Sequence, residues 1–175
     1  MTATVQLLAE RGRMVTMDEI TVAAGVGKAS IYRRWHTSDA LLLDVVATLG
    51  VQGLDHGPGA GDLRGDLVRV AIAATTGTAA AAEIALLPEL GRSHLLQQAY
   101  RRGPSVRLAE ALLHCQLRGD RRGEMTWPSP APVVAVVRML QHGALLERRE
   151  PTAAAVEDLV DEIVLPALRA PRTAA

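Results

Sequence analysis

Apolar residues recur at helical spacing along almost the whole chain, and the strict alternation of a half-buried β-strand is nearly absent. Val and Ile occur mostly among Ala, Leu, Glu and Arg, which favour helices. The chain has 175 residues, of which 49% are hydrophobic, so it is long enough to bury a sizeable core. We therefore predict an all-α fold.

A glycine-rich stretch divides the chain. Residues 53–61 read GLDHGPGAG, and such a run of glycines with a proline is typical of a loop or a domain boundary. We predict a first domain at residues 1–52 and a second at residues 62–175. The expected helices cover 3–11 (ended by Gly12), 17–24, 28–35, 38–50, 62–82, 93–117 (interrupted at Gly103-Pro104), 132–147 and 152–169.

Composition sets limits on the compartment. Cys115 is the only cysteine, so no intrachain disulfide can form. No apolar run reaches the roughly 20 residues of a membrane helix. The first residues, Met1 to Thr4, lack the charged start and apolar stretch of a signal peptide. We therefore expect a cytoplasmic protein with no membrane partner.

The net charge is zero, with 19 basic and 19 acidic residues, which taken alone argues against a surface coated with positive charge for nucleic acid. The average hides a local excess. Within residues 26–38, Lys28, Arg33 and Arg34 occur with no acidic residue among them. Neutral overall charge therefore does not exclude DNA binding.

Residues 17–35 have the pattern of a helix-turn-helix. Thr16 and Glu19 form a capping box at the start of the first short helix, and Gly25-Val26-Gly27 separates it from the second. The spacing predicts an inward set of Ile20, Ala24, Val26 and Ile31. The outward set is then Lys28, Ala29, Ser30, Tyr32, Arg33 and Arg34, which offers phosphate charge, hydrogen bonds and guanine contacts. Small helical domains of other kinds also contain such joints, and charged faces are usually just solvated.

The sequence resembles the DNA-binding domain of the tetracycline-repressor (TetR) family over residues 3–49. The matching elements are LLAERG (7–12), TMDEI (16–20), AAGV (23–26), KASIYR (28–33) and ALL (40–42). The resemblance implies a three-helix DNA-binding domain followed by a helical ligand-binding and dimerisation domain. It places DNA contacts on Thr16, Asp18, Lys28, Ala29, Ser30, Tyr32 and Arg34, to which we add Arg33 and, through its hydroxyl, Ser38. Trp35 stands where the family usually has Phe in the core, and Gly27 lacks a capping hydroxyl found in many members.

The same resemblance implies a homodimeric regulator of palindromic operators, most simply a repressor. A small-molecule effector would enter a pocket among residues 62–146 and shift the helix at 38–50. The last two helices would pair with those of a second copy. The interface residues expected from their apolar faces are Val133, Val137, Leu140, Ala144, Val156, Leu159, Val160 and Ile163.

Other patterns do not support chemistry. The segment GVGKAS (25–30) lacks the first glycine of a phosphate-binding loop and the hydroxyl after its lysine. Adjacent His114 and Cys115 diverge on a helix, and the histidines show no metal-ligand spacing. We expect no enzyme, metal or cofactor, and Cys115 as a small buried apolar residue. The arginines of residues 92–122 suit a solvated face or an anion site. A helical small-molecule binding protein without operator binding is the alternative function.

Overall fold

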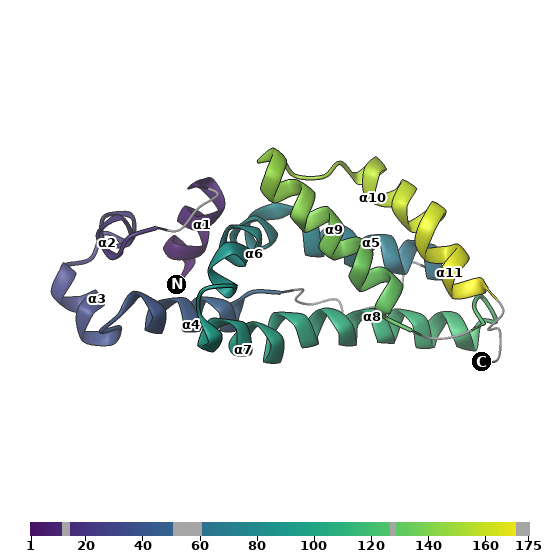
Figure 1. Ribbon diagram of the computed structural model, residues 1–175, viewed down its shortest axis with the longest axis horizontal. Coiled ribbons are helices and arrows are strands. Elements are labelled where there is room, and N and C mark those ends of the chain that lie inside the picture. The colour runs from purple at the N-terminus through teal and green to yellow at the C-terminus, as the bar shows by residue number, and fades with distance from the viewer. Residues whose placement is uncertain (12–14, 51–60, 127–128, 171–175) are drawn as a thin grey trace. The chain divides into compact units, whose positions relative to one another are not determined.

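The computed structural model describes residues 1–11, 15–50, 61–126 and 129–170. These residues contain helices and no strand, which confirms the all-α prediction (Figure 1). Gly12 and residues 53–60 of the glycine-rich stretch lie outside the described residues. The chain forms two compact units, residues 1–50 with 76–106 and residues 51–75 with 107–175. Residues 76–106 therefore pack with the N-terminal residues, although they follow the glycine-rich stretch in the chain.

The first unit is built on two helix contacts that join its two chain segments. α6 packs against α1, and α7 packs against α4. Leu8, Val45 and Leu96 are among the side chains buried where these helices meet. Tyr100 of α7 donates its hydroxyl hydrogen to the buried Glu83 of α6 at 2.5 Å. The helices are α1 (Thr2–Arg11), α2 (Met17–Ala24), α3 (Lys28–Arg34), α4 (Ser38–Thr48), α6 (Gly77–Leu90) and α7 (His94–Arg102).

The predicted single helix over 62–82 is wrong. α5 (Leu63–Thr75) ends one residue before Thr76, and α6 begins at Gly77. Gly77 has a φ of 82°, a left-handed conformation that glycine adopts without the steric cost of a side chain. The helical spacing of apolar residues continues through this point, which is why the pattern alone did not reveal the break. By contrast, the predicted interruption at Gly103-Pro104 is confirmed, since α7 ends at Arg102 and α8 begins at Pro104.

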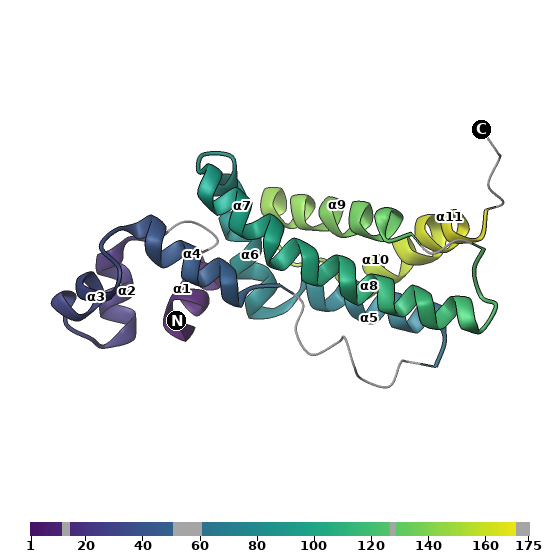
Figure 2. The ribbon, with the colours of Figure 1, turned by 90° about the horizontal axis from the view of Figure 1, so that it is seen from below.

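The second unit surrounds α5. Its core contains Leu67 and Val70 of α5, Leu112 of α8 and Val137 of α9, all fully buried. In both views α8 lies beside α5 (Figure 1 and Figure 2). A Cβ added at Gly119 would stand 2.9 Å from Cδ1 of Leu63, so a glycine permits this close approach. Besides α5, the helices of this unit are α8 (Pro104–Arg121, from Arg107 on), α9 (Ala131–Glu147), α10 (Ala153–Leu159) and α11 (Leu165–Arg169).

The C-terminal helix contains a π-helical turn over Val160–Val164, so the predicted regular helix over 152–169 is only partly right. The N–H of Leu165 bonds to the carbonyl oxygen of Val160, five residues back. Pro166 follows at once. In a regular α-helix its ring would clash with the carbonyl group four residues before it, and the wider turn relieves that clash. The extra residue in the turn leaves Val160 and Val164 buried and turns Ile163 outward.

A buried carboxylate joins α5 to α8. Asp66 is fully buried, and its oxygens lie 3.3 Å from Nη2 of Arg69, 3.0 Å from Nε of Arg118 and 3.7 Å from Nη2 of Arg122. We call these four residues the Asp66 cluster. Arg118 and Arg122 belong to the arginine-rich segment 92–122, so part of that segment forms internal ion pairs, which neither earlier interpretation included. Cys115 is buried beside this cluster, as predicted, and burial raises the pKa of its thiol.

Among the residues that the structure describes, no single helix is long and apolar enough to cross a membrane, and only α5 and α6 taken together reach the required length and composition.

Candidate nucleic-acid interface

The first helix of the motif starts where the sequence predicts. The Thr16 hydroxyl accepts a hydrogen bond from the N–H of Glu19 at 3.2 Å, and the Glu19 carboxylate accepts one from the N–H of Thr16 at 2.7 Å. This capping box satisfies two backbone donors at the start of α2. Ile20 and Thr21 bury one side of the helix, which leaves Asp18 and Val22 exposed on the other. The cap therefore fixes where Thr16 and Asp18 emerge from the surface.

The turn between the two helices is tight. Gly25 has a φ of 63° and ends α2 in the left-handed conformation, which explains the need for glycine there. Gly27 occupies the N-cap of α3 without a side-chain hydrogen bond. Ile20 and Ile31 are buried as predicted, but Ala24 and Val26 are exposed. That part of the predicted inward set is wrong. For Val26 the reason is that the left-handed Gly25 turns the chain before Val26 can return to the core.

α3 presents one buried side and a broad exposed surface. Ile31 is 4% exposed and holds the helix on the core of the first unit. On a helical wheel, Ala29 and Arg33 stand opposite Ile31, with Lys28 and Tyr32 on one flank and Ser30 and Arg34 on the other. All six outward residues of the sequence prediction are exposed. We call them, together with Thr16, Asp18 and Ser38, the reading surface.

The side chains of the reading surface are chemically suited to contact phosphates and base edges in a DNA groove. Ala29 at its centre has a small side chain that permits close approach and contact with a thymine methyl group. Arg33 beside it can donate two hydrogen bonds to guanine or pair with phosphate. Tyr32 and Ser30 add hydroxyl groups on either flank. An α-helix with its side chains is roughly 10–12 Å across, which fits a major groove about 12 Å wide.

One cation of the reading surface already has an acidic partner. Nζ of Lys28 donates to Oδ2 of Asp18 at 2.7 Å, and both side chains are more than half exposed. The hydrogen bond and the charge of Asp18 raise the pKa of Lys28. The family resemblance places both residues in the expected DNA-contacting set, but the sequence does not show that they pair across the two helices. Any phosphate contact by Lys28 must compete with this ion pair.

The end of α3 is joined to α4. Trp35 is half-buried, packs against the core and donates from Nε1 to Oδ2 of Asp44 at 2.8 Å. Packing is the role predicted for this residue, whereas its bond to Asp44 was missed. The guanidinium carbon of Arg34 lies 4.7 Å from the centre of the Trp35 ring. The sequence offered only one signal for this bond: an acidic residue lies nine positions after the tryptophan, with the start of a helix between them.

α4 begins at Ser38, and Thr37 provides its cap by accepting from the N–H of Ala40 at 3.1 Å. Thr37, and not Ser38, is therefore the N-cap of α4. The Ser38 side chain is exposed at the first position of the helix. Leu41, Leu42, Val45 and Val46 bury the opposite side of α4. Ser38 is thus held on a packed element at the border of the reading surface.

The comparisons with known proteins cover both the motif and nearly all of the chain. The family described as "Bacterial regulatory proteins, tetR family" matches residues 1–45. Uncharacterised helix-turn-helix-type transcriptional regulators of Mycobacterium bovis and of two strains of Mycobacterium tuberculosis are 32% identical over 174 residues, which covers 94% of this chain and 84% of theirs. The chain belongs to the TetR family of transcriptional regulators. Its first helices are accordingly the DNA-binding helix-turn-helix domain of a regulator.

The TetR-family regulator has a shallow groove next to its recognition helix, α3. The groove has a volume of about 230 Å³ and is lined by Ser30, Arg34 and Trp35, by Val26 and by the start of α1. Val26 is therefore exposed to this groove and not to open solvent alone. Ser30 and Arg34 border it from one flank of α3, and Lys28 meets Asp18 on the other.

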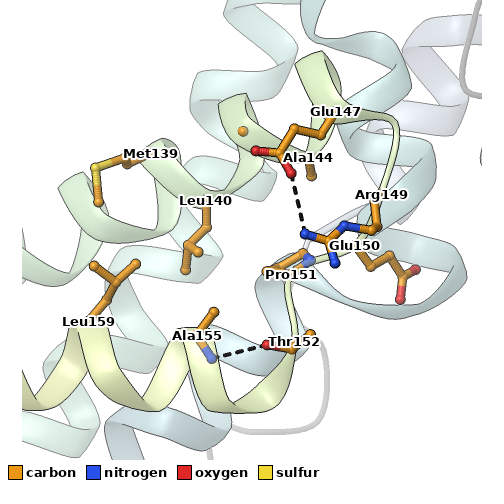
Figure 3. Close-up of a pocket in the computed structure, with 11 residues that line it drawn as sticks. Met139, Leu140, Ala144, Glu147, Arg149, Glu150, Pro151, Thr152, Ala155 and Leu159 are labelled. Carbon is orange, nitrogen blue, oxygen red and sulfur yellow. Dashed lines mark hydrogen bonds and ion pairs between the residues drawn. The ribbon is translucent and has the colours of Figure 1, made fainter.

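A second hollow lies between the end of α9 and the start of α10. It has a volume of about 220 Å³, below the usual range of about 300–1,000 Å³ for ligand pockets. Figure 3 shows Met139, Leu140 and Leu159 around its apolar part and the Glu147–Arg149 ion pair of 3.5 Å at its rim. Only its α9 residues up to Ala144 fall within the range 62–146 predicted for an effector pocket. Within the described parts of the chain, no group of His, Cys, Asp and Glu could hold a metal ion.

The residues predicted for the dimer interface divide into two groups. Val133, Val137, Val156 and Val160 are fully buried in the regulator's own core, and Leu140 is nearly so. Ala144 and Leu159 are half-buried beside the hollow of Figure 3, and Ile163 is 44% exposed. Helical periodicity identified the apolar faces, but it could not tell whether the protomer's own helices or a partner would cover them.

Proposed function

We propose that this regulator binds a palindromic operator as a homodimer, represses transcription there, and is released by a small-molecule effector. The observation that carries the DNA part is the reading surface. Ala29, Arg33 and Tyr32 are exposed together on a helix whose opposite side is fixed by Ile31. Two such helices, placed by a dimer about 34 Å apart, match successive turns of a major groove.

The DNA part is tested by footprinting and by fluorescence anisotropy on the DNA that flanks the gene of this regulator. We expect salt-sensitive and sequence-selective binding by the full chain. Arg33→Ala should lose about 1–3 kcal/mol of discrimination at one base position if Arg33 contacts a base, whereas an equal loss on all sequences marks a phosphate contact. Arg121→Ala, at an exposed arginine of α8, is the matched control. Absence of selective binding by the wild-type chain would refute the proposal.

A homodimer is supported by apolar side chains that the protomer leaves uncovered on its last helices. Met139 and Leu146 of α9 are 51% and 71% exposed, and they lie seven residues apart on one face. Ile163, turned outward by the π turn, is the exposed member of the set predicted from sequence. We propose these three residues, which we call the outer apolar face, as the centre of the dimer contact, since large exposed apolar side chains are candidates for burial against a partner.

Light scattering on a sizing column tests the dimer. Leu146→Glu should give a monomer, because burying a carboxylate in an apolar contact is costly, and should weaken operator binding with it. Leu113→Glu is the matched control, since Leu113 is an exposed leucine of α8 outside the outer apolar face. A dimer that survives Leu146→Glu and Met139→Glu would place the interface elsewhere.

The effector part of the proposal is supported by family membership alone. An unbiased thermal-shift screen of the full chain tests it. Anything that binds the native state raises the unfolding temperature by mass action. A ligand that also lowers operator affinity would support release. A ligand found in a chain that binds no DNA would instead favour the alternative, a helical small-molecule binding protein.

A further inference from the structure

The recognition helix ends at a residue that bonds to the next helix. Trp35 is the C-cap of α3, where the backbone becomes extended with φ −127° and ψ 103°. Its N–H bonds back to the carbonyl oxygen of Ile31 at 2.8 Å, and its indole Nε1 donates to Oδ2 of Asp44 at 2.8 Å. A phenyl ring could occupy the same space but could not make the second bond. The indole thus connects α3 to the middle of α4.

The indole is held on more than one side. One side packs against the core of the first unit, and its edge is fixed by the charge-assisted bond to Asp44. Its face lies under the Arg34 guanidinium, with 4.7 Å between the guanidinium carbon and the ring centre. A cation favours this position because the face of an aromatic ring carries negative potential. Because the indole of Trp35 is held in place, the exposed guanidinium of Arg34 that lies over it has fewer positions available.

Asp44 itself is exposed and lies on α4, and it is not one of the residues of the reading surface. Its carboxylate accepts the hydrogen bond from the Trp35 indole. The opposite side of α4 is fixed by Val45, Val46 and their neighbours in the core. A movement of α4 relative to α3 would therefore change the Asp44–Trp35 bond first. The position of the Arg34 guanidinium would change next, since the ring beneath it would no longer be held.

We propose that Asp44 is a positioning residue for operator recognition: it holds the Trp35 indole, and the indole holds Arg34 in the orientation that reaches DNA. This rests on the proposed function in one respect, namely that Arg34 contacts the operator. The proposal adds a residue outside the predicted DNA-contacting set and gives Trp35 a second role beside packing. It also makes α4 a helix whose position determines how Arg34 is presented.

The experiment measures operator affinity and base discrimination for the full chain carrying Asp44→Ala, Trp35→Phe or both. We expect each single change to weaken operator binding by about five- to tenfold, the scale of coupling between contacting residues. The double variant should be no weaker than the single variants, because both remove the same bond. In an Arg34→Ala background, Asp44→Ala should have no further effect.

Two variants separate the hydrogen bond from charge. Asp44→Asn keeps an acceptor oxygen but removes the charge, so it should restore most of the affinity lost in Asp44→Ala. Asp39→Ala removes the other exposed acid of α4 and is the matched control. If Asp44→Ala behaved like Asp39→Ala, or if the two single losses added in the double variant, the proposal would be overturned. Thermal unfolding of every variant establishes that each one is folded.

A second readout does not depend on DNA. The chain has two tryptophans, so a Trp127→Phe background leaves Trp35 as the only indole. In that background, Asp44→Ala should shift the fluorescence emission of Trp35, and Asp39→Ala should not. If the wild-type chain binds no operator, the proposed function fails whatever the fluorescence shows. If the wild-type binds and Arg34→Ala binds equally well, only the positioning role of Asp44 fails.

Discussion

Two acid–base contacts of similar length differ sharply in their surroundings. Lys28 meets Asp18 at 2.7 Å on the surface of the first unit, and Arg118 meets Asp66 at 3.0 Å inside the second. The Asp18 side chain is 58% exposed, whereas that of Asp66 is fully buried. Water and salt screen the first contact, so its net contribution to stability is small. A buried carboxylate that loses its partner cannot be hydrated, so the second contact is costly to break.

The comparison distinguishes an ion pair whose acid can be replaced by another anion from an ion pair that holds helices together. A partner such as a phosphate group can replace Asp18 beside Lys28 at little cost, since the ammonium group stays hydrated in either case. Loss of Asp66 would leave the Arg118 guanidinium group without its carboxylate inside the second unit. The charges that a DNA-binding protein offers to its partner are thus the weakly held ones, and the strongly held ones fix the helices.

The largest expected effect comes from removing the charge of Asp66. Asp66→Asn should destabilise the chain by about 3 kcal/mol, toward the lower end of the range for breaking buried ion pairs, because the arginines of the Asp66 cluster remain partly solvated. Chemical denaturation measures this free energy. Asp120→Asn, at an exposed acid of α8, is the control and should change it little. Equal effects of the two changes would remove the contrast between buried and exposed pairs.

A smaller effect is expected from the capping box that fixes the reading surface. Thr16→Ala removes the acceptor for the Glu19 N–H and should destabilise the first unit by about 1 kcal/mol. Thr16→Ser keeps the hydroxyl oxygen and should restore most of that loss. Thermal unfolding followed by circular dichroism measures both variants. Equal stability of the alanine and serine variants would mean that the cap contributes nothing in solution.

The exposed pair should affect DNA binding more than stability. Asp18→Asn frees Lys28 from its acidic partner and should strengthen binding to non-specific DNA by about threefold at low salt, with the gain falling as salt is raised. Asp39→Asn, at another exposed acid, is the control for the general loss of negative charge. Anisotropy titrations at several salt concentrations measure the effect. A gain that is independent of salt, or equal in the control, would contradict the exchange interpretation.

The smallest expected effect is on the stability of the fold at acidic pH. Arg122 holds the pKa of Glu124 below its ordinary value of 4.5, and Arg64 holds that of Asp161 below 3.8. Because these pKa values are lower in the folded state, the stability they contribute is present above the ordinary values and is lost as pH falls through the folded ones. Unfolding temperature should therefore decline below about pH 4.5. The double variant Glu124→Gln/Asp161→Asn should show a shallower decline, and an unchanged pH profile would exclude the role of these carboxylates.

The sequence predicted what depends on local chemistry. The Thr16–Glu19 capping box, the glycine turn after α2 and the outward set of α3 follow from short-range rules, and the structure has them as expected. The buried Cys115 was likewise expected from its residue type. The family was identified from motifs of the same short range, and the relatives extend it over 94% of the chain.

What was missed depends on contacts between distant residues. Asp66 and Arg118 are separated by 52 positions, and nothing in either neighbourhood indicates that they meet. Trp35 was predicted to pack, but its hydrogen bond to Asp44 requires knowing the angle between α3 and α4. The valines of α9 and α10 were assigned to a partner because apolar periodicity looks the same whether a protomer or a second copy covers it. Val26 was assigned to the core because the pattern does not include the turn made by Gly25.

The π turn at Val160–Val164 also determines how the chain tolerates a change of length. The turn holds one residue more than a regular α turn would. A deletion of one residue there would restore a uniform helix, but the ring of Pro166 would then meet the carbonyl group four positions before it. The extra residue and the proline are therefore interdependent. Descendants of this chain that lose the extra residue should be found to have replaced the proline as well.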